Sequence, residues 1–156
     1  VGATPEQVSA GIADFRGAGR RFEILGKCNG AVIADDYAHH PAELKVTLEA
    51  AKELHYKRVW AVFQPFTYSR TAMLLEDFAK VLPIADKVVM TEIMGSREKN
   101  TYNIYTKDLA AKIDGSVWFP TFEEVADYLR QNITEGDLVI TLGCGDVYKI
   151  AKMLIS

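Results

Sequence analysis

Short apolar runs recur along the chain and alternate with amphipathic segments. Four runs are continuous rather than alternating, at residues 31–34, 59–63, 88–90 and 138–142. Continuous runs of this length are typical of strands covered by helices on both faces. A shorter run, Val117-Trp118-Phe119, indicates a further strand. Because strands and helices follow one another in turn, the pattern predicts an α/β domain with a doubly wound, mostly parallel, Rossmann-like sheet.

The segments between these runs place apolar residues at helical spacing. After Pro41 the apolar positions are Leu44, Leu48 and Ala51, and the apolar residues of segment 74–82 also recur at helical spacing. Thr121 and Glu124 have the spacing of a capping box, which predicts that a helix starts there. One more apolar stripe closes the chain, at Val147, Ile150, Ala151 and Leu154.

The first part of the chain departs from this rhythm. Thr4-Pro5-Glu6-Gln7 has the composition of a helix start. Residues 20–25 alternate polar and apolar, and we expect them to pair antiparallel with the first core strand through the turn Cys28-Asn29-Gly30. We interpret residues 1–19 as a linker or the end of a preceding domain, and 20–156 as the domain itself. A start at Val1 rather than Met fits a piece of a longer protein.

Composition narrows the class of protein. The chain has 156 residues, of which 49% are hydrophobic and 25% charged, enough for one full core. A formal net charge of -3 argues against a nucleic-acid binder. The two cysteines have neither metal-ligand nor disulfide spacing, and no apolar run matches a membrane span or a signal peptide. We therefore expect a cytoplasmic protein with no metal site and no membrane contact.

A first polar cluster follows the first core strand, where doubly wound sheets bind ligands. It reads Asp35-Asp36-Tyr37-Ala38-His39-His40-Pro41. Its carboxylates and imidazoles could bind ribose hydroxyls, ammonium groups or a metal. The alternative is an ordinary helix start, in which an Asp compensates the dipole and a His caps a backbone group. Adjacent histidines point to different sides, so we do not expect both to bind one metal.

A second cluster follows the next strand and reads Gln64-Pro65-Phe66-Thr67-Tyr68-Ser69-Arg70-Thr71. Arg70 stands at a helix start beside free amide groups, which could bind a carboxylate or phosphate; the alternative is a surface arginine. Ser69 has no base beside it in the sequence, so no nucleophile is predicted.

Two weaker clusters complete the candidates. Arg20 and Arg21 could reach a partner domain or its bound phosphate, or could be solvated linker residues. Gly143 and Gly145 allow close backbone approach, but Tyr148 stands where a dinucleotide fingerprint needs a third glycine. Turn glycines are the favoured interpretation, and a nicotinamide-dependent oxidoreductase is disfavoured.

In order and spacing, the segments 19–23, 35–41 and 63–71 resemble the motifs of the C-terminal domain of the Mur ligases. The stretch from Phe-Gln-Pro to Ser-Arg-Thr favours the alanine-adding branch over the peptide-recycling one. This resemblance implies a reaction in which ATP and Mg²⁺ activate the carboxylate of UDP-N-acetylmuramate as an acyl phosphate, which L-alanine attacks. It also implies partner N-terminal and central domains, and no activity for this chain alone, since no phosphate loop is present.

The same resemblance implies roles for individual residues. ATP would be bound by Arg21, Asp36, His39 and His40, and L-alanine by Arg70, Phe66 and Thr67. Two positions depart from the family, which usually has His at Phe66 and commonly Tyr at Met94. Phe66 can neither donate nor accept a hydrogen bond, so other groups would have to compensate. The alternative to a ligase domain is a freestanding, flavodoxin-like binding or regulatory module.

Overall fold

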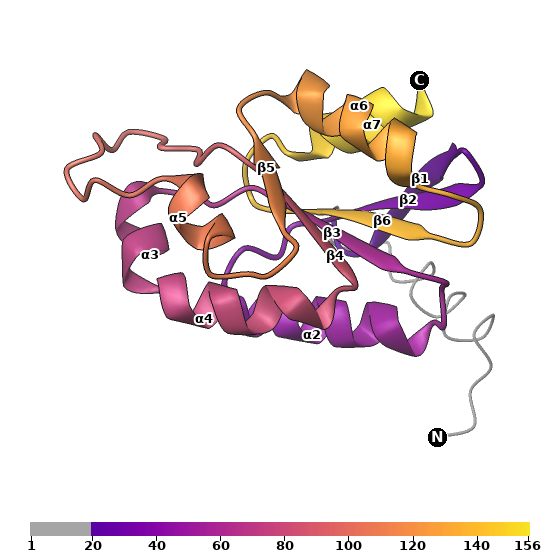
Figure 1. Cartoon of the computed structure of the whole chain (residues 1–156), viewed down its shortest axis with the longest axis horizontal. Coiled ribbons are helices and arrows are strands. Elements are labelled where there is room, and N and C mark those ends of the chain that lie inside the picture. Colours follow the sequence, from indigo (N-terminus) through magenta and orange to yellow (C-terminus); the bar gives the residue numbers. More distant parts are fainter. Residues whose placement is uncertain (1–19) are drawn as a thin grey trace.

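The computed structural model describes residues 20–156, which form a six-stranded sheet with helices on both faces (Figure 1). The strand order is β1-β2-β6-β3-β4-β5. β1 (Glu23–Cys28) runs antiparallel to β2 (Ala31–Asp36). The remaining neighbours are parallel, namely β6 (Leu138–Leu142), β3 (Val59–Phe63), β4 (Lys87–Thr91) and β5 (Val117–Phe119). The predicted mostly parallel sheet with an antiparallel hairpin strand is confirmed.

The helices form two layers. α2 (Pro41–Glu53), α4 (Leu75–Val81) and the short 3-10 turn η1 (Leu82–Ile84) cover one face of the sheet (Figure 1). α6 (Phe122–Asn132) and α7 (Tyr148–Ile155) cover the other. Two short helices, α3 (Tyr68–Met73) and α5 (Thr106–Ala110), lie at the left of Figure 1. The long loop of residues 92–105 projects beside them.

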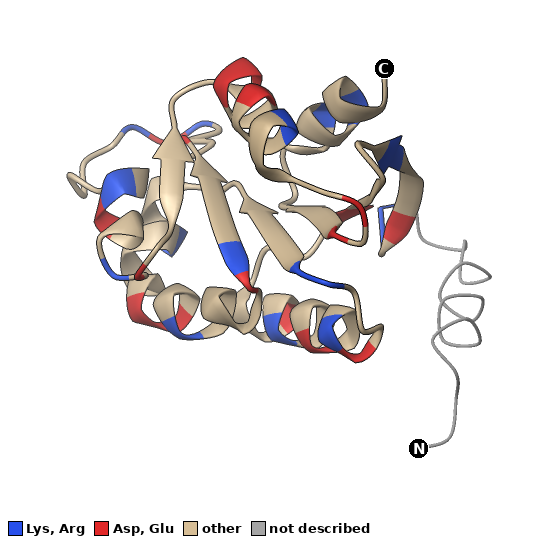
Figure 2. Ribbon diagram, turned by 45° about the vertical axis from the view of Figure 1, so that its right-hand side comes forward, with Lys and Arg blue, Asp and Glu red and all other residues tan. Residues whose placement is uncertain are grey.

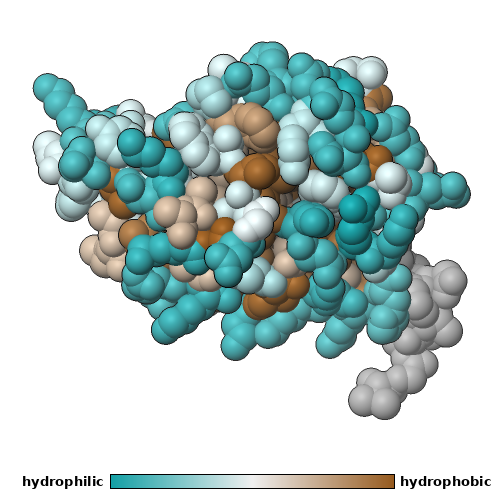
Figure 3. All heavy atoms as spheres, viewed as in Figure 1, coloured by the Kyte–Doolittle hydropathy of each residue, from teal (hydrophilic) through white to brown (hydrophobic). Residues whose placement is uncertain are grey.

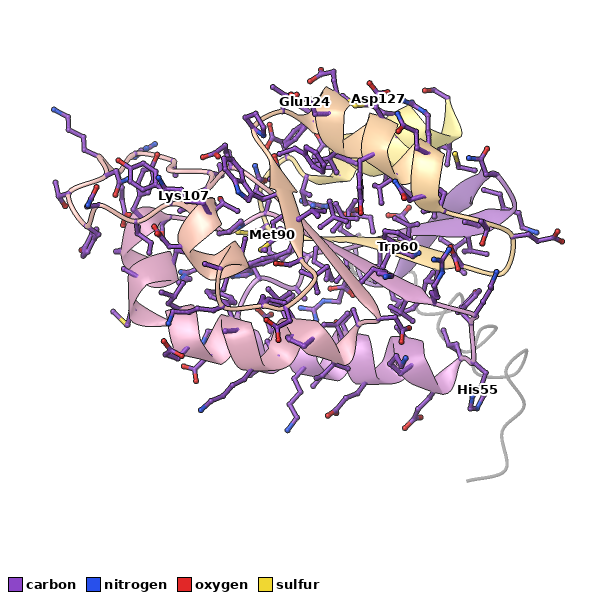
Figure 4. All side chains as sticks on the ribbon, viewed as in Figure 1. His55, Trp60, Met90, Lys107, Glu124 and Asp127 are labelled. Carbon is purple, nitrogen blue, oxygen red and sulfur yellow. The ribbon has the colours of Figure 1, made fainter. Side chains whose placement is uncertain are left out.

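β3 shows why its sequence is apolar without alternation. All five residues are buried, and successive side chains enter different cores. Val59, Ala61 and Phe63 pack with α2 and α4, whereas Trp60 and Val62 pack with α6 and α7. Trp60, labelled in Figure 4, meets the ring of Tyr128 edge-on, with ring centres 6.4 Å apart. One strand therefore serves two cores, and both of its faces must be apolar.

Local signals set several element ends as predicted. Thr121 and Glu124 form the predicted capping box at the start of α6. Asn29 and Gly30 both have positive φ, 52° and 81°, as a tight hairpin turn between β1 and β2 requires. β1 nevertheless begins at Glu23 rather than at residue 20. The φ angles of Arg20 and Phe22, 62° and 44°, are incompatible with a strand.

Other elements differ from the prediction. The helix predicted over residues 74–82 is present as α4 with η1, but the second cluster does not open it: residues 68–73 form the separate short helix α3, which ends at Leu74. Neither α5 nor the loop of residues 92–105 was predicted. The helix expected from Thr4 and the interpretation of residues 1–19 lie outside the described residues.

The described surface is mixed in charge and mostly polar. Acidic and basic residues are interspersed on the helices that cover the sheet (Figure 2). Hydrophilic residues cover most of the face shown in Figure 3, with apolar residues visible between them. Within residues 20–156, no helix combines the length and the apolar character needed to span a membrane.

Candidate functional site

The carboxyl end of β6 is where the chain diverges toward the two faces of the sheet. The helices that follow β2 and β3 pack on one face, whereas α7, which follows β6 between them, packs on the other. Loops that separate in this way leave room for a ligand between them. Because β2, β6 and β3 are adjacent, the clusters that follow them lie along one rim.

Asp35 and Asp36 end β2 and are both buried. Asp35 accepts hydrogen bonds from Arg20 Nε at 2.8 Å and from Thr141 Oγ1 at 2.7 Å. Asp36 accepts from the backbone amides of Phe22 at 2.9 Å and Ala38 at 2.7 Å. Burial raises the pKa of the Asp36 carboxyl, and these two amide hydrogen bonds oppose that rise. Asp36 therefore fixes the surrounding backbone, whereas Asp35 fixes the side chains of Arg20 and Thr141.

Arg20 and Arg21, at the start of the described domain, point to different environments. The Arg20 guanidinium turns into its own domain and donates to Asp35 and to the carbonyl oxygens of Gly143 and Gly145, both at 2.9 Å. Arg21 is exposed, and its charge acts to lower the pKa of Asp36. For Arg20, the expectation of a solvated linker residue or of a charge reaching outward is wrong. Arg21 alone remains available to an outside anion.

His39 and His40 lie at the start of α2. His40 Nδ1 accepts from the Ala42 amide at 3.2 Å, and Glu43 accepts from the His40 amide at 3.1 Å. These reciprocal bonds cap the helix, so the capping role weighed as an alternative is confirmed for His40. His39 Nδ1 lies 3.0 Å from the Tyr37 carbonyl oxygen. The two rings are thus held in different surroundings, and nucleotide contact by either one stays a prediction.

Arg70 lies in the first turn of α3, but the amides beside it are not free. The Arg70 amide donates to Thr67 Oγ1 at 3.4 Å, and the Ser69 amide donates to Glu98 Oε2 at 2.9 Å. The expectation of free amide groups is therefore wrong. The Arg70 guanidinium remains as the possible anion contact, 5.8 Å from the centre of the Phe66 ring. Thr67 has φ 63°, a strained conformation for a β-branched residue and a common mark of functional sites.

Glu98 belongs to this site and was missed in the sequence. It comes from the loop of residues 92–105, and its carboxylate accepts from both the amide and the hydroxyl of Ser69. The hydroxyl hydrogen bond, followed by the amide one, holds the pKa of Glu98 below its usual value, with a further contribution from the Arg70 charge. No local pattern marks this residue, because its partner lies far away in the chain.

Phe66 and Met94, the two departures from the Mur ligase pattern, are neighbours. They form an isolated parallel bridge, and the Thr67 amide donates to the Met94 carbonyl at 2.9 Å. A Cβ atom on Gly145 would collide with the Met94 sulfur and would lie 2.8 Å from Gln64 Oε1. That oxygen is buried and has no hydrogen-bond partner among the described residues. Gly145 therefore lets the loop after β6 pack closely against the side chains of Gln64 and Met94, which would have to move for any larger residue.

Cys144 marks the middle of the rim. Burial raises the pKa of its thiol, while the charges of Arg70 and Arg20 act in the opposite direction and that of Glu43 adds to the rise. Backbone hydrogen bonds join the strand ends here: the Gly143 amide donates to the Asp36 carbonyl at 3.3 Å, and the Gln64 amide donates to the Leu142 carbonyl at 3.1 Å. The segments that follow β2, β6 and β3 therefore begin side by side.

A groove of about 320 Å³ opens beside the first cluster. Arg21, Asp36 and Tyr37 line one side, and α2 provides the other through Ala42, Glu43, Val46 and Thr47. The groove therefore has the Arg21 guanidinium on one side and a partly apolar surface of α2 on the other. Arg70, His39 and His40 do not line it. The residues expected to bind ATP are thus only partly gathered in one groove, and the residues expected to bind L-alanine lie outside it.

Comparisons with known proteins give a consistent picture. A UDP-N-acetylmuramate--L-alanine ligase from Acetivibrio thermocellus is 44% identical to this chain, covering 99% of it and 34% of the relative. The chain thus spans about a third of the length of that curated relative. The UDP-N-acetylmuramate-alanine ligase MurC from Thermotoga maritima superimposes with a TM-score of 0.72 at 26% identity, covering 91% of this chain and 30% of that one.

A more distant structure shares the fold alone. The MurF ligase from Thermotoga maritima, in complex with ADP, has a TM-score of 0.64 at 18% identity and covers 91% of this chain and 32% of that one. Residues 20–145 match the family model described as "Mur ligase, glutamate ligase domain". With this match over most of its length, the chain belongs to the Mur ligase family.

Proposed function

We propose that this chain is the C-terminal domain of an ATP-dependent ligase that joins L-alanine to UDP-N-acetylmuramate in peptidoglycan synthesis. In this proposal residues 20–156 are that domain, and residues 1–19 are a linker to a central ATPase domain or the end of it. The observation that carries the proposal is the rim at β2, β6 and β3, with Arg21 on one side and Arg70 on the other. It is supported by relatives that bear this enzyme's name.

The groove beside Arg21 is the proposed nucleotide contact. An exposed guanidinium can engage two phosphate oxygens at once, and the α2 surface can lie against a base or ribose. Asp36 borders the groove, and His39 and His40 begin the adjacent helix. The MurF ligase that shares this fold was solved in complex with ADP, and an ATP-dependent ligase would need a nucleotide contact. A metal has no proposed ligands in residues 20–156, where no three His, Cys, Asp or Glu side chains gather.

The segment after β3 is the proposed amino-acid contact. Arg70 would bind the L-alanine carboxylate with its planar fork, and Phe66 and Thr67 would form the wall beside it. Phe66 offers only an apolar surface, which suits the methyl group of alanine. The chemistry demanded of these residues is positioning and charge stabilisation rather than nucleophilic attack.

Kinetics of the complete ligase test these assignments. Arg70→Ala is expected to raise KM for L-alanine and leave KM for ATP unchanged, because only the carboxylate contact is lost. Arg21→Ala is expected to raise KM for ATP instead. Arg130→Ala, an exposed arginine on α6, is the matched control. Wild-type alanine kinetics in Arg70→Ala would remove Arg70 from the site, and a complete protein that consumes no ATP with L-alanine would refute the function.

A further inference from the structure

The Arg20 side chain makes hydrogen bonds to two separate segments of the rim, the end of β2 and the loop after β6. Its guanidinium donates from Nε to Asp35, from Nη1 to the Gly145 carbonyl and from Nη2 to the Gly143 carbonyl, at 2.8, 2.9 and 2.9 Å. Its own carbonyl oxygen accepts from the Tyr37 amide at 2.5 Å. The start of the domain, the end of β2 and the loop after β6 therefore meet at this residue.

The surroundings of the guanidinium hold it in place. It lies 5.3 Å from the centre of the Tyr37 ring and 4.8 Å from that of Tyr148, and its side chain is only 23% exposed. Asp35 is fixed in turn by Thr141, which occupies its other oxygen. Without Arg20, one carboxylate oxygen and two carbonyl oxygens would converge with no donor between them. Such groups repel one another and are costly to leave unpaired when partly buried.

Arg20 and its hydrogen-bond partners lie between the two proposed ligand contacts. On one side, Phe22 donates to Asp36, which borders the groove of Arg21. On the other side, Gly143 packs against Gln64, which begins the segment that carries Arg70: a Cβ atom at Gly143 would lie 3.2 Å from the Gln64 carbonyl oxygen. A displacement of Arg20 would therefore move both the proposed nucleotide contact and the proposed amino-acid contact.

We propose that Arg20 is a positioning residue that holds the loop of residues 143–146 and the end of β2 with Tyr37 in the arrangement the ligase reaction needs. We call the hydrogen bonds of Arg20 to Asp35, Gly143 and Gly145 the Arg20 clamp. The kinetic effect of the clamp rests on the proposed function, whereas the existence of the clamp does not. Arg20 touches neither substrate; it acts through the loop and the end of β2. A lysine cannot replace it, because a single ammonium on a flexible stem cannot match the three-point fork.

The kinetic test uses the complete ligase with Arg20→Ala and Arg20→Lys, and with Arg130→Ala as control. Both Arg20 variants are expected to raise KM for ATP and for L-alanine, and to lower kcat roughly 100-fold, the scale of a displacement of about 1 Å in a positioning element. Millimolar methylguanidinium is expected to restore part of the activity of Arg20→Ala. A variant that remains folded with both KM values unchanged has lost only stability, and that result would overturn the proposal.

A second readout does not depend on ligase activity. In a Cys28→Ser background, alkylation of Cys144 by iodoacetamide reports how firmly the loop is held, provided that rate constants are compared per thiolate after pH titration of each variant, because loss of the Arg20 charge itself changes the thiol pKa. Arg20→Ala is expected to be alkylated faster than the parent, and methylguanidinium to slow the reaction again. An unchanged rate would overturn the clamp even if the complete protein is a ligase. Should the complete protein show no L-alanine-dependent ATP consumption, a faster rate in Arg20→Ala would still support the clamp and would separate the two failures.

Discussion

Asp137 lies at the amino end of β6, and its carboxylate accepts hydrogen bonds from residues at the amino end of β3. We expect Asp137→Ala to lower the free energy of unfolding more than substitution of any exposed acidic residue does. The carboxylate is fully buried and accepts from Arg58 Nε at 3.0 Å and Nη2 at 2.7 Å. It also accepts from Trp60 Nε1 at 3.1 Å and from the Thr134 amide at 2.9 Å. Removing it strands all of these donors at once.

The expected cost follows from what each donor can do afterwards. Breaking a buried ion pair by removing one partner costs about 3–5 kcal/mol. Arg58 recovers part of this, because its side chain is 29% exposed and can turn to water. The Trp60 indole, 2% exposed, cannot, and an unpaired buried donor costs about 1–3 kcal/mol. We therefore expect a loss of about 3–4 kcal/mol out of the roughly 5–15 kcal/mol typical of a domain, or about 10 °C in Tm.

Urea denaturation of the 156-residue chain, followed by circular dichroism, measures this cost. Asp127→Ala is the matched control, because Asp127 forms an exposed ion pair with Arg130 on α6 and should cost about 0.5 kcal/mol or less (Figure 4). Asp137→Asn keeps one acceptor oxygen and should fall between the two. If Asp137→Ala cost no more than Asp127→Ala, the reasoning from buried donors would be refuted.

The same residue predicts a pH dependence. Burial alone would raise the pKa of Asp137, but the hydrogen bonds from Arg58, Thr134 and Trp60 outweigh it and hold the pKa below its usual value. A lowered folded-state pKa stabilises the fold above the unfolded value of about 3.9, and that stabilisation is lost as the pH falls toward the folded value. The difference between the parent and Asp137→Ala should therefore stay constant near neutral pH and shrink below about pH 4.

Three further outcomes follow from contacts described above. Ser69→Ala removes the hydroxyl that donates to Glu98, so hydrogen exchange in residues 92–105 should accelerate with little change in Tm; unchanged exchange would contradict this role for Ser69. Gly143→Ala should cost about 1–3 kcal/mol in urea titrations, because φ is 151° and a Cβ would lie 3.1 Å from Val147. Gly115→Ala, with positive φ but no atom within 4 Å, should cost less. Thr121→Ala should lose about 1 kcal/mol with the cap of α6, whereas Thr121→Ser should not.

The strands and four of the helices, α2, α4, α6 and α7, could be predicted because their signals are local and periodic. β3 is apolar at every position because each face meets a separate core, and Thr121 with Glu124 specifies the start of α6. The break at Leu74 has no such signal. Neither Gly nor Pro stands there, and residues 72–75 are all apolar. Packing of Phe78 against Phe63, with ring centres 5.2 Å apart, favours the separate course of α4.

The location of the site could be predicted, but the contacts of its individual residues could not. The order of the strands brings the clusters after β2, β6 and β3 together, as strand-end reasoning predicts. Which arginine turns inward depends on the positive φ angles of Arg20 and Phe22. Neither residue is of a type that favours positive φ, so the sequence does not predict these angles. Glu98 reaches Ser69 across a loop without periodicity. Contacts between distant loop residues leave no trace in spacing, so these had to come from the structure.

β6 follows every other described strand in the sequence, yet it lies in the centre of the sheet between β2 and β3. Until residues 138–142 are in place, the hairpin β1–β2 and the group β3–β4–β5 have no backbone pairing with one another, and each presents an unpaired edge. Open edges of this kind template association between chains, and sheets closed by distant segments form slowly. On a ribosome, this domain would keep both edges open until its central strand emerges, so the last stage of its synthesis is the one most in need of protection by chaperones.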